Sequence, residues 1–317
     1  MIDNIHIMGI VNLNGDSFYA ASRTSGAYAA ARARQMWADG ADVVDLGACS
    51  TRPGSKQPDV EEEWKRLEPA LKEIAGNSLP EACPPPDKGR GRGPLDTSSC
   101  DSEERRRQWE GPERAKRTES SGREFPAISV DTFRAEIVRR TYETIGPFLV
   151  NDISAGELDS EMLETVGRLG LPYVAMHMRG TPENMQSLTD YDDVVAEVIR
   201  YFKDFSKKAA DAGIREWILD PGFGFAKTIG QNHELLRRLG EVKEAFPQEI
   251  LVGLSRKSMI YKVLGITPEE AMPSTQVLNF AALERGATWL RVHDVVPAVH
   301  TAKLYSTMYT SSPGAAK

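Results

Sequence analysis

The sequence predicts a single (β/α)₈ barrel, an α/β fold of the TIM type, and two observations support this. Short apolar strands alternate with amphipathic helical stretches eight times along the chain. Each helix returns the chain to the start of the next strand, so the strands of such a repeat lie parallel. The chain has 317 residues, and removing one low-complexity stretch of roughly 50 leaves about 267, close to the ~250 typical of this barrel.

The eight strands are expected to be buried on both faces, because they form continuous apolar runs such as Val43-Val44-Asp45-Leu46. They begin near His6, Asp42, Ala127, Phe148, Pro172, Trp217, Ile250 and Thr288. Between them, apolar residues recur at helical spacing. The expected helices cover 27–38, 61–74, 134–145, 160–169, 191–212, 232–245, 275–285 and 295 to about 308. A doubly wound open sheet is the alternative, but no glycine-rich nucleotide-binding motif follows the first strand.

The stretch 77–126 differs in composition from the rest of the chain. It is rich in Pro, Gly, Ser, Arg and Glu, and holds ten acidic and ten basic residues but almost no large apolar ones. Such a segment buries too little surface to offset its ordering entropy, so we expect a disordered insert. The barrel would then consist of residues 1–76 and 127–317. The connection lies between a helix and the next strand, which places it on the barrel face opposite the site, where we expect it to be dispensable.

Composition excludes several classes of protein. A net charge of −7 argues against a broad nucleic-acid footprint, which needs a basic face. The apolar runs are shorter than the roughly 20 residues that span a bilayer, and we see no secretion signal. Cys49, Cys83 and Cys100 have neither disulfide-framework nor zinc-site spacing. We therefore expect a cytoplasmic globular protein that binds neither membranes nor nucleic acid.

Polar residues lie at the ends of the predicted strands, where barrels of this class carry their active sites. Singly, each has an ordinary explanation, such as a helix cap for Asp131. Together they divide by charge. The acceptors are Asp131, Asn151 and Asp220, and the cations and imidazole are Arg52, Arg256, Lys257, Arg291 and His293. Acceptors suit a heterocycle rich in N–H groups, with an aromatic such as Phe225 stacked on it, and arginines suit a phosphate or diphosphate.

At these positions the chain resembles the dihydropteroate synthases over nearly its whole length outside 77–126. Eight motifs, one per strand, carry the resemblance: Met8-Gly9-Ile10-Val11-Asn12 with Asp16-Ser17-Phe18; Ser50-Thr51-Arg52-Pro53-Gly54; Ser129-Val130-Asp131-Thr132; Asn151-Asp152-Ile153-Ser154; Met176-His177-Met178-Arg179-Gly180-Thr181-Pro182; Asp220-Pro221-Gly222-Phe223-Gly224-Phe225; Ser255-Arg256-Lys257-Ser258; and Arg291-Val292-His293-Asp294. Each motif alone is weak, but eight in this order are specific.

The resemblance implies a transferase of folate biosynthesis. It would condense 6-hydroxymethyl-7,8-dihydropterin diphosphate with p-aminobenzoate, releasing diphosphate and forming 7,8-dihydropteroate. In that family diphosphate leaves first, and the amine attacks a pterin-stabilised carbocation. The resemblance also implies Mg²⁺ as cofactor, a homodimer formed through the last helices, and a target of sulfonamides, which mimic p-aminobenzoate.

The resemblance assigns roles to matching residues. The pterin site would consist of Asp131, Asn151, Met176, Asp220, Phe225, Gly253 and Lys257. The p-aminobenzoate site would consist of Thr51, Arg256, Ser258 and Phe225. Diphosphate would be bound by Arg52, Arg291 and His293, and Mg²⁺ by Asn12, whose amide oxygen suits that ion. The implied catalytic residues are Asp16, Arg52 and Lys257, with Asp16 stabilising the cation.

Two loops depart from the family pattern. Asn14 and Gly15 replace the usual Thr-Pro, which frees the backbone and should make the loop harder to order. Cys49 replaces a Glu, and we interpret it as a packed cysteine. Two other functions remain open. One is a pterin-dependent methyltransferase, which would need no diphosphate site. The other is a non-catalytic pterin-binding paralogue, which only the altered first loop favours.

Overall fold

The computed structural model describes residues 5–13, 25–49, 57–76 and 127–310, and in these ranges eight parallel strands form one sheet. The strands are β1 (His6–Asn12), β2 (Val43–Gly47), β3 (Ile128–Asp131), β4 (Leu149–Asp152), β5 (Tyr173–Met176), β6 (Trp217–Asp220), β7 (Leu251–Val252) and β8 (Trp289–Val292). Their order is β6-β5-β4-β3-β2-β1-β8-β7, and a parallel bridge between Leu219 and Ile250 joins the two ends. The predicted (β/α)₈ barrel is confirmed.

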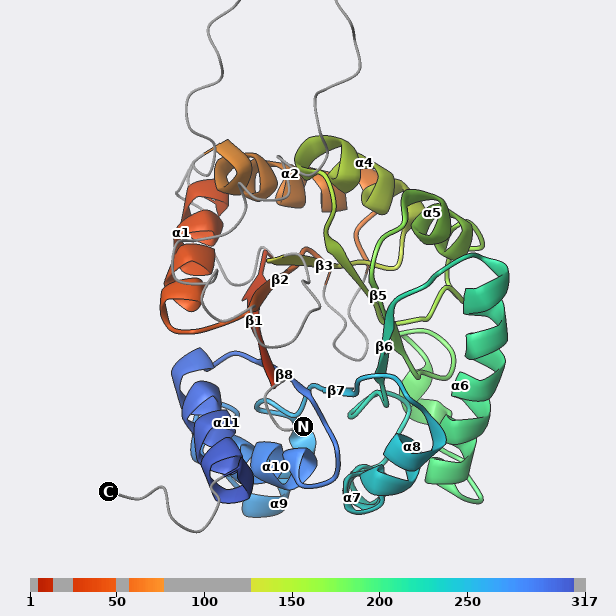
Figure 1. Cartoon of the computed structure of the whole chain (residues 1–317), viewed down its shortest axis with the longest axis vertical. Coiled ribbons are helices and arrows are strands. Elements are labelled where there is room, and N and C mark those ends of the chain that lie inside the picture. The colour runs from red at the N-terminus through yellow and green to blue at the C-terminus, as the bar shows by residue number, and fades with distance from the viewer. Residues whose placement is uncertain (1–4, 14–24, 50–56, 77–126, 311–317) are drawn as a thin grey trace, which may run out of the picture.

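Helices surround this sheet on its outer side (Figure 1). They are α1 (Ser25–Ala38), α2 (Val60–Gly76), α4 (Ala135–Ile145), α5 (Met162–Leu169), α6 (Val194–Asp211), α7 (Ile229–Arg237), α8 (Leu239–Ala245), α9 (Ser258–Leu264), α10 (Met272–Leu283) and α11 (Val295–Thr310), with a 3₁₀ turn η3 (Met185–Ser187). Every predicted strand start lies within one residue of the observed one.

Two helical predictions were wrong in detail. The helix predicted over 232–245 is broken between α7 and α8, where Arg238 leaves the helical region with φ −104° and ψ 15°. The Arg238 guanidinium donates hydrogen bonds to Glu234 at 2.9 Å and Glu241 at 2.8 Å, one on each side of the break.

Helix α9 was not predicted, because its seven residues are too few to show a periodicity. It ends at Gly265, whose φ of +67° gives the left-handed stop typical of glycine.

The barrel interior holds a small apolar cluster, separate from the larger core between sheet and helices. Every strand except β3 contributes one buried side chain to it: Met8, Val43, Leu149, Val174, Ile218, Leu251 and Trp289. Alternate residues of a strand point to the same face, so the residue two positions further along also points inward. The apolar cluster thus fixes which side chains form the next interior layer.

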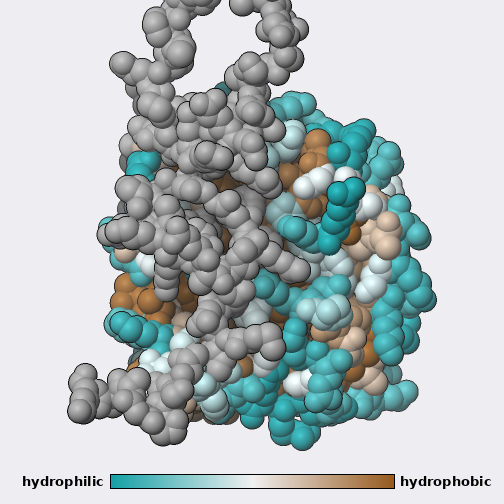
Figure 2. All heavy atoms as spheres, in the orientation of Figure 1, coloured by the Kyte–Doolittle hydropathy of each residue, from teal (hydrophilic) through white to brown (hydrophobic). Residues whose placement is uncertain are grey.

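The outer surface over α5 and α6 is mostly hydrophilic (Figure 2). Among the described residues, no helix has the length and apolarity needed to cross a membrane. The predicted disordered insert at 77–126 lies outside the described residues. So do Cys83, Cys100 and three predicted site residues, Asp16, Thr51 and Arg52.

Candidate active site

The second interior layer of the barrel is polar and lies at the carboxyl ends of the strands. Its members follow those of the apolar cluster by two residues: Asp45 after Val43, Asn151 after Leu149, Met176 after Val174, Asp220 after Ile218, Gly253 after Leu251 and Arg291 after Trp289. Asp131, the last residue of β3, joins them through its contact with Arg291. The predicted pterin-site residues of five different strands therefore converge on one end of the barrel.

Arg291 is the centre of this layer. Its Nη2 lies 2.6 Å from Asp45 Oδ2 and 2.8 Å from Asp131 Oδ2, and its Nε donates to Asp45 Oδ2 at 2.7 Å. Asn151 Nδ2 donates to the same Asp45 oxygen at 3.0 Å. Strands β2, β3, β4 and β8 are thus joined across the barrel by charge-assisted hydrogen bonds. The structure pairs Arg291, predicted to bind diphosphate, with two carboxylates.

Burial controls the protonation of this cluster. It raises the pKa of the Asp131 carboxyl to about 7, with Arg291 opposing the rise and Asp45 adding to it. Burial alone would lower the pKa of Arg291, but Asp45 and Asp131 reverse this, so the guanidinium stays charged. One permanent cation therefore faces two carboxylates, one of which is close to titration at neutral pH.

A second group of predicted residues gathers around the turn after β6. Gly222 N donates to Asp220 Oδ1 at 2.8 Å, which ties the carboxylate to the turn. The ammonium of Lys257 donates to Phe223 O and lies 5.0 Å from the centroid of the Phe225 ring. Burial lowers the pKa of Lys257 to about 8, with Asp220 opposing the shift. These contacts place a carboxylate, an ammonium and an aromatic ring side by side.

The neighbouring wall is apolar. Met176, Ile153, Met178, Met185 and Ala226 form a separate buried cluster, and Phe133, Leu158 and Phe225 pack against it. A flat ligand between this wall and the polar layer would meet thioether and aromatic surface on its faces and hydrogen-bonding groups at its edge.

The two loops after β7 and β8 face each other. Arg256 makes a bidentate pair with Asp294, at 3.0 Å from Nε and 2.7 Å from Nη2. Its backbone is left-handed, with φ +56°, a rare conformation for a residue with a side chain. His293 Nδ1 lies 3.0 Å from Ser255 Oγ, and burial followed by Arg291 lowers the pKa of its imidazole to about 4. His293 therefore offers a neutral imidazole. Ser258 begins helix α9 beside them.

Asn12, the predicted Mg²⁺ ligand, ends β1 beside the polar layer. A Cβ built on Gly47 would lie 3.8 Å from Asn12 Oδ1 and 3.6 Å from Asp131 Oδ2, so both oxygens face that glycine. Among the described residues, no group of three or more His, Cys, Asp or Glu side chains could hold a metal ion. Mg²⁺ commonly takes one or two protein oxygens and completes its shell with water and substrate phosphates, so a single amide oxygen fits that ion.

Cys49 is packed, as interpreted from the sequence. It is 6% exposed, and Arg134 Nη1 lies 3.5 Å from its sulfur. Burial and the neighbouring Glu63 raise the pKa of the thiol far above its usual value, which keeps it protonated and poorly nucleophilic.

The sequence reasoning missed Asp45, which pairs with Arg291, and gave no role to His177 and Lys227, which contact each other beside the turn after β6. Asp45 is fully buried, and the charged residue within the apolar run 43–46 was the available signal. A buried charge inside a strand is rare unless it is paired, so it should have marked a partner across the barrel. His177 lay within a family motif but received no role.

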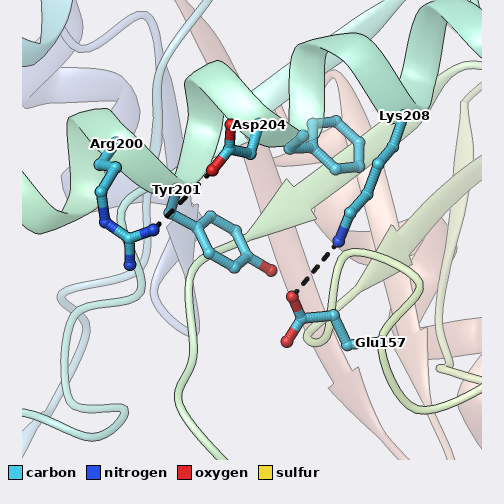
Figure 3. Close-up of a pocket in the computed structure, with 6 residues that line it drawn as sticks. Glu157, Arg200, Tyr201, Asp204 and Lys208 are labelled. Atoms are coloured by element: carbon cyan, nitrogen blue, oxygen red, sulfur yellow. Dashed lines mark ion pairs between the residues drawn. The ribbon is translucent and has the colours of Figure 1, made fainter.

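The described residues also line a cavity of about 180 Å³ between α6 and Glu157, which precedes α5 (Figure 3). An ion pair joins Lys208 on α6 to Glu157 at 3.7 Å, and a second, between Arg200 and Asp204 at 3.8 Å, runs along α6 itself. The cavity shares no residue with the polar layer.

Comparison with known proteins identifies the family. A family model described as "Pterin binding enzyme" matches residues 8–81 and 117–293. The chain belongs to the pterin-binding enzymes. The dihydropteroate synthase of Escherichia coli strain K12 is 34% identical over 302 residues, which cover 94% of this chain and 90% of that protein.

Solved structures of pterin-binding enzymes agree with this. The Yersinia pestis dihydropteroate synthase with a sulfonamide drug complex has a TM-score of 0.77 and 28% identity, covering 98% of this chain and 96% of that one. The Xanthomonas albilineans dihydropteroate synthase with 4-aminobenzoic acid has a TM-score of 0.76 and 31% identity, covering 98% and 95%.

Replacing Arg291 by Met should lower the free energy of unfolding by about 3–5 kcal/mol, because it leaves two buried carboxylates without their cation. Urea denaturation at pH 7 measures this. The control is Arg200→Met on α6, whose guanidinium is largely exposed and whose loss should leave the midpoint near that of the wild type. An Arg291→Met protein as stable as the control would contradict the central role of this cation.

Proposed function

We infer that the protein is a dihydropteroate synthase of folate biosynthesis. It condenses 6-hydroxymethyl-7,8-dihydropterin diphosphate with p-aminobenzoate and releases diphosphate. The observation that carries this function is the convergence of Asp131, Asn151, Asp220 and Lys257 on one end of the barrel in a chain of the pterin-binding family. This chain matches relatives named dihydropteroate synthase over nearly their whole length.

The polar layer suits a pterin. Asp131 and Asp220 carboxylates accept hydrogen bonds from ring N–H groups, and the Asn151 amide can both accept and donate. The apolar wall around Met176 and the Phe225 ring pack against the faces of the heterocycle, and Gly253 keeps that edge open. Asp131 contacts Arg291 through Oδ2, so its carboxylate can accept from the pterin while keeping that ion pair.

The reaction breaks the bond between the pterin methylene carbon and the diphosphate oxygen, and the electron pair leaves with diphosphate. The arylamine nitrogen then bonds the methylene carbon and loses a proton. Arg291, Arg52 and His293 stabilise the departing diphosphate, and Asp16 the positive charge on the pterin. Mg²⁺ held by the Asn12 oxygen would neutralise phosphate charge when bound.

The p-aminobenzoate site is proposed next to the ring of Phe225. Arg256, Ser258 and Thr51 would hold the carboxylate and ring, with Arg256 oriented by its pair with Asp294. The Xanthomonas albilineans relative was solved with 4-aminobenzoic acid and the Yersinia pestis relative with a sulfonamide drug complex. Sulfonamides would therefore compete for this site.

Product analysis separates this function from its rivals. Purified protein given both substrates and Mg²⁺ should release diphosphate and form 7,8-dihydropteroate in equal amounts. A non-catalytic paralogue would bind the pterin diphosphate without turnover, and a methyltransferase would form no dihydropteroate. Either result would refute the proposal.

A cytoplasmic location is part of the proposed function as well, since a diphosphate ester does not cross a bilayer unaided. Cell fractionation tests that location.

Replacing Lys257 by Ala should reduce kcat/KM on the order of 100-fold, because the ammonium beside Asp220 and the Phe225 ring is removed from the pterin site. A coupled diphosphate assay measures the loss. Lys262→Ala is the control, since that lysine is exposed on helix α9, which directly follows Lys257. Wild-type turnover in Lys257→Ala would show that the pterin site is misplaced.

Residues 77–126 are proposed to be an insertion that catalysis does not need. The family model leaves 82–116 unmatched, and the connection joins the end of α2 to the start of β3, on the face opposite the site. Deleting 82–123 should leave kcat within about twofold of the wild type. A large loss of turnover, with the circular dichroism spectrum unchanged, would overturn this.

The protein is also proposed to be a homodimer. Helices α10 and α11 pack together and expose large apolar side chains: Val277 (68% exposed), Leu304 (64%), Met308 (64%) and Tyr309 (49%). Apolar surface gathered on one pair of helices is typical of an interface. Leu304→Glu should shift sedimentation from dimer to monomer, whereas Tyr28→Glu on α1 should not. A wild-type monomer would refute the proposal.

A further inference from the structure

Lys227 is a buried cation to which the reaction assigns no role. It is 3% exposed and follows the turn after β6. Its ammonium lies 2.9 Å from His177 Nδ1, 3.0 Å from Gly222 O and 3.1 Å from Phe225 O. These three acceptors match the three N–H donors of an ammonium. Among the described residues, none of the ion pairs includes Lys227. The hydrogen-bond acceptors of this ammonium are therefore all neutral, and burial lowers its pKa to about 7, with the charge of Asp220 opposing the shift.

Burying such a charge costs free energy, so we look for its role in the groups that it hydrogen-bonds. Two of its acceptors are carbonyls of one turn, Gly222 and Phe225. Without the ammonium both oxygens would lie buried and unpaired. An apolar side chain at position 227 would remove the buried charge but could not satisfy them.

The turn that Lys227 holds has an unfavourable backbone. Gly222, Gly224 and Ala226 all have positive φ, at +72°, +83° and +49°. Ala226 has a side chain, so the left-handed conformation there requires support from neighbouring contacts. A Cβ on Gly222 would lie 1.9 Å from His177 O, which shows how closely the turn packs on the end of β5.

The opposite side of the same turn faces the pterin site. Asp220 is tied to it through Gly222 N, and Phe223 O accepts from Lys257. Two lysines therefore hold one turn from two sides, Lys257 within the site and Lys227 behind it. Moving the carbonyls of Gly222 or Phe225 would move Asp220, the Phe225 ring and the acceptor of Lys257 together.

His177 supplies the third acceptor and is itself fixed. Its backbone N donates to Asp220 O at 3.0 Å, and its ring meets Tyr201 edge to face, with centroids 4.9 Å apart. Tyr201 borders the cavity between α6 and Glu157 (Figure 3), and its hydroxyl lies 3.3 Å from Ser154 O. Burial, followed by the charge of Lys227, lowers the pKa of the imidazole well below its usual value. The Nδ1 atom of a neutral imidazole can accept the hydrogen bond that the Lys227 ammonium donates.

We propose that Lys227 and His177 are positioning residues that hold the 220–226 turn in the shape that binds the pterin. The proposal rests on the function inferred above. It assigns neither residue a contact with substrate. Both act through Asp220, Phe225 and Lys257.

Lys227→Met tests the proposal, because Met has a similar length but no donor. The Kd of 6-hydroxymethyl-7,8-dihydropterin, measured by titration calorimetry, should rise at least about tenfold, and the KM for the pterin diphosphate should rise with it. The kcat at saturation should fall less than KM rises, because the residues around diphosphate are untouched. The Kd of inorganic diphosphate with Mg²⁺ should stay within about twofold. The control is Lys207→Met, an exposed lysine on α6.

His177 provides a second pair of variants in case Lys227→Met fails to fold. Asn places an amide oxygen near the position of Nδ1, whereas Leu places no acceptor there. His177→Asn should bind the pterin within about threefold of the wild type, and His177→Leu should reproduce the loss in Lys227→Met. Equal affinities for the two variants, or wild-type pterin binding by Lys227→Met, would overturn the proposal. A wild-type protein that forms no dihydropteroate would instead refute the inferred function, since pterin binding is measured without turnover.

Discussion

The pairing of Arg291 with Asp45 and Asp131 is the interaction on which the rest of the site depends. A (β/α)₈ barrel is normally filled with apolar side chains, and here the apolar cluster of the barrel interior follows that rule. The layer above it contains carboxylates, which can be buried only if a cation compensates them. Arg291 provides that charge from β8 and reaches β2 and β3 across the barrel. Once it is in place, Asp131 and Asn151 can face a ligand.

The site is built in two halves that meet at Asp220. One half belongs to the strands, where Arg291 and the carboxylates are held by the pleat of the sheet. The other belongs to the turn after β6, where backbone carbonyls accept from Lys227 behind and Lys257 in front. Asp220 ends β6 and is bonded to the turn, so it links the two. A pterin ring would lie against both halves at once.

Much of the fold could be predicted from the sequence because strand burial and helix periodicity are local properties. The strand starts near His6 and Trp289 needed only the apolar runs that begin there. Strand ends also identified Asp131, Asn151 and Asp220 by their chemistry. The pairing of Arg291 with Asp45 could not be predicted, because these residues are 246 positions apart and only barrel closure brings them together. The break between α7 and α8 at Arg238 could not be predicted either, since the apolar periodicity of the sequence continues through it.

Lys227 shows a further limit. In the sequence it looks like an ordinary lysine after a glycine-rich turn, and nothing local marks it as buried. Its burial follows from the path of the turn, which places its ammonium beneath two carbonyls. Charged residues whose partners are backbone oxygens leave no complementary charge in the sequence to search for.

In the proposed function, the same atoms that neutralise the barrel interior would also recognise the ligand, and this would restrict how the protein can evolve. A substitution at Asp131 or Arg291 that weakened an inhibitor bound in the pterin half would also leave a buried charge without its partner. Escape by that route would reduce the amount of folded enzyme as well as its affinity. The proposed p-aminobenzoate half includes Ser258, which is not among the residues that contact Arg291 in the described part of the chain. Substitutions selected by a drug in that proposed half would therefore carry a smaller penalty to folding than substitutions at Asp131 or Arg291.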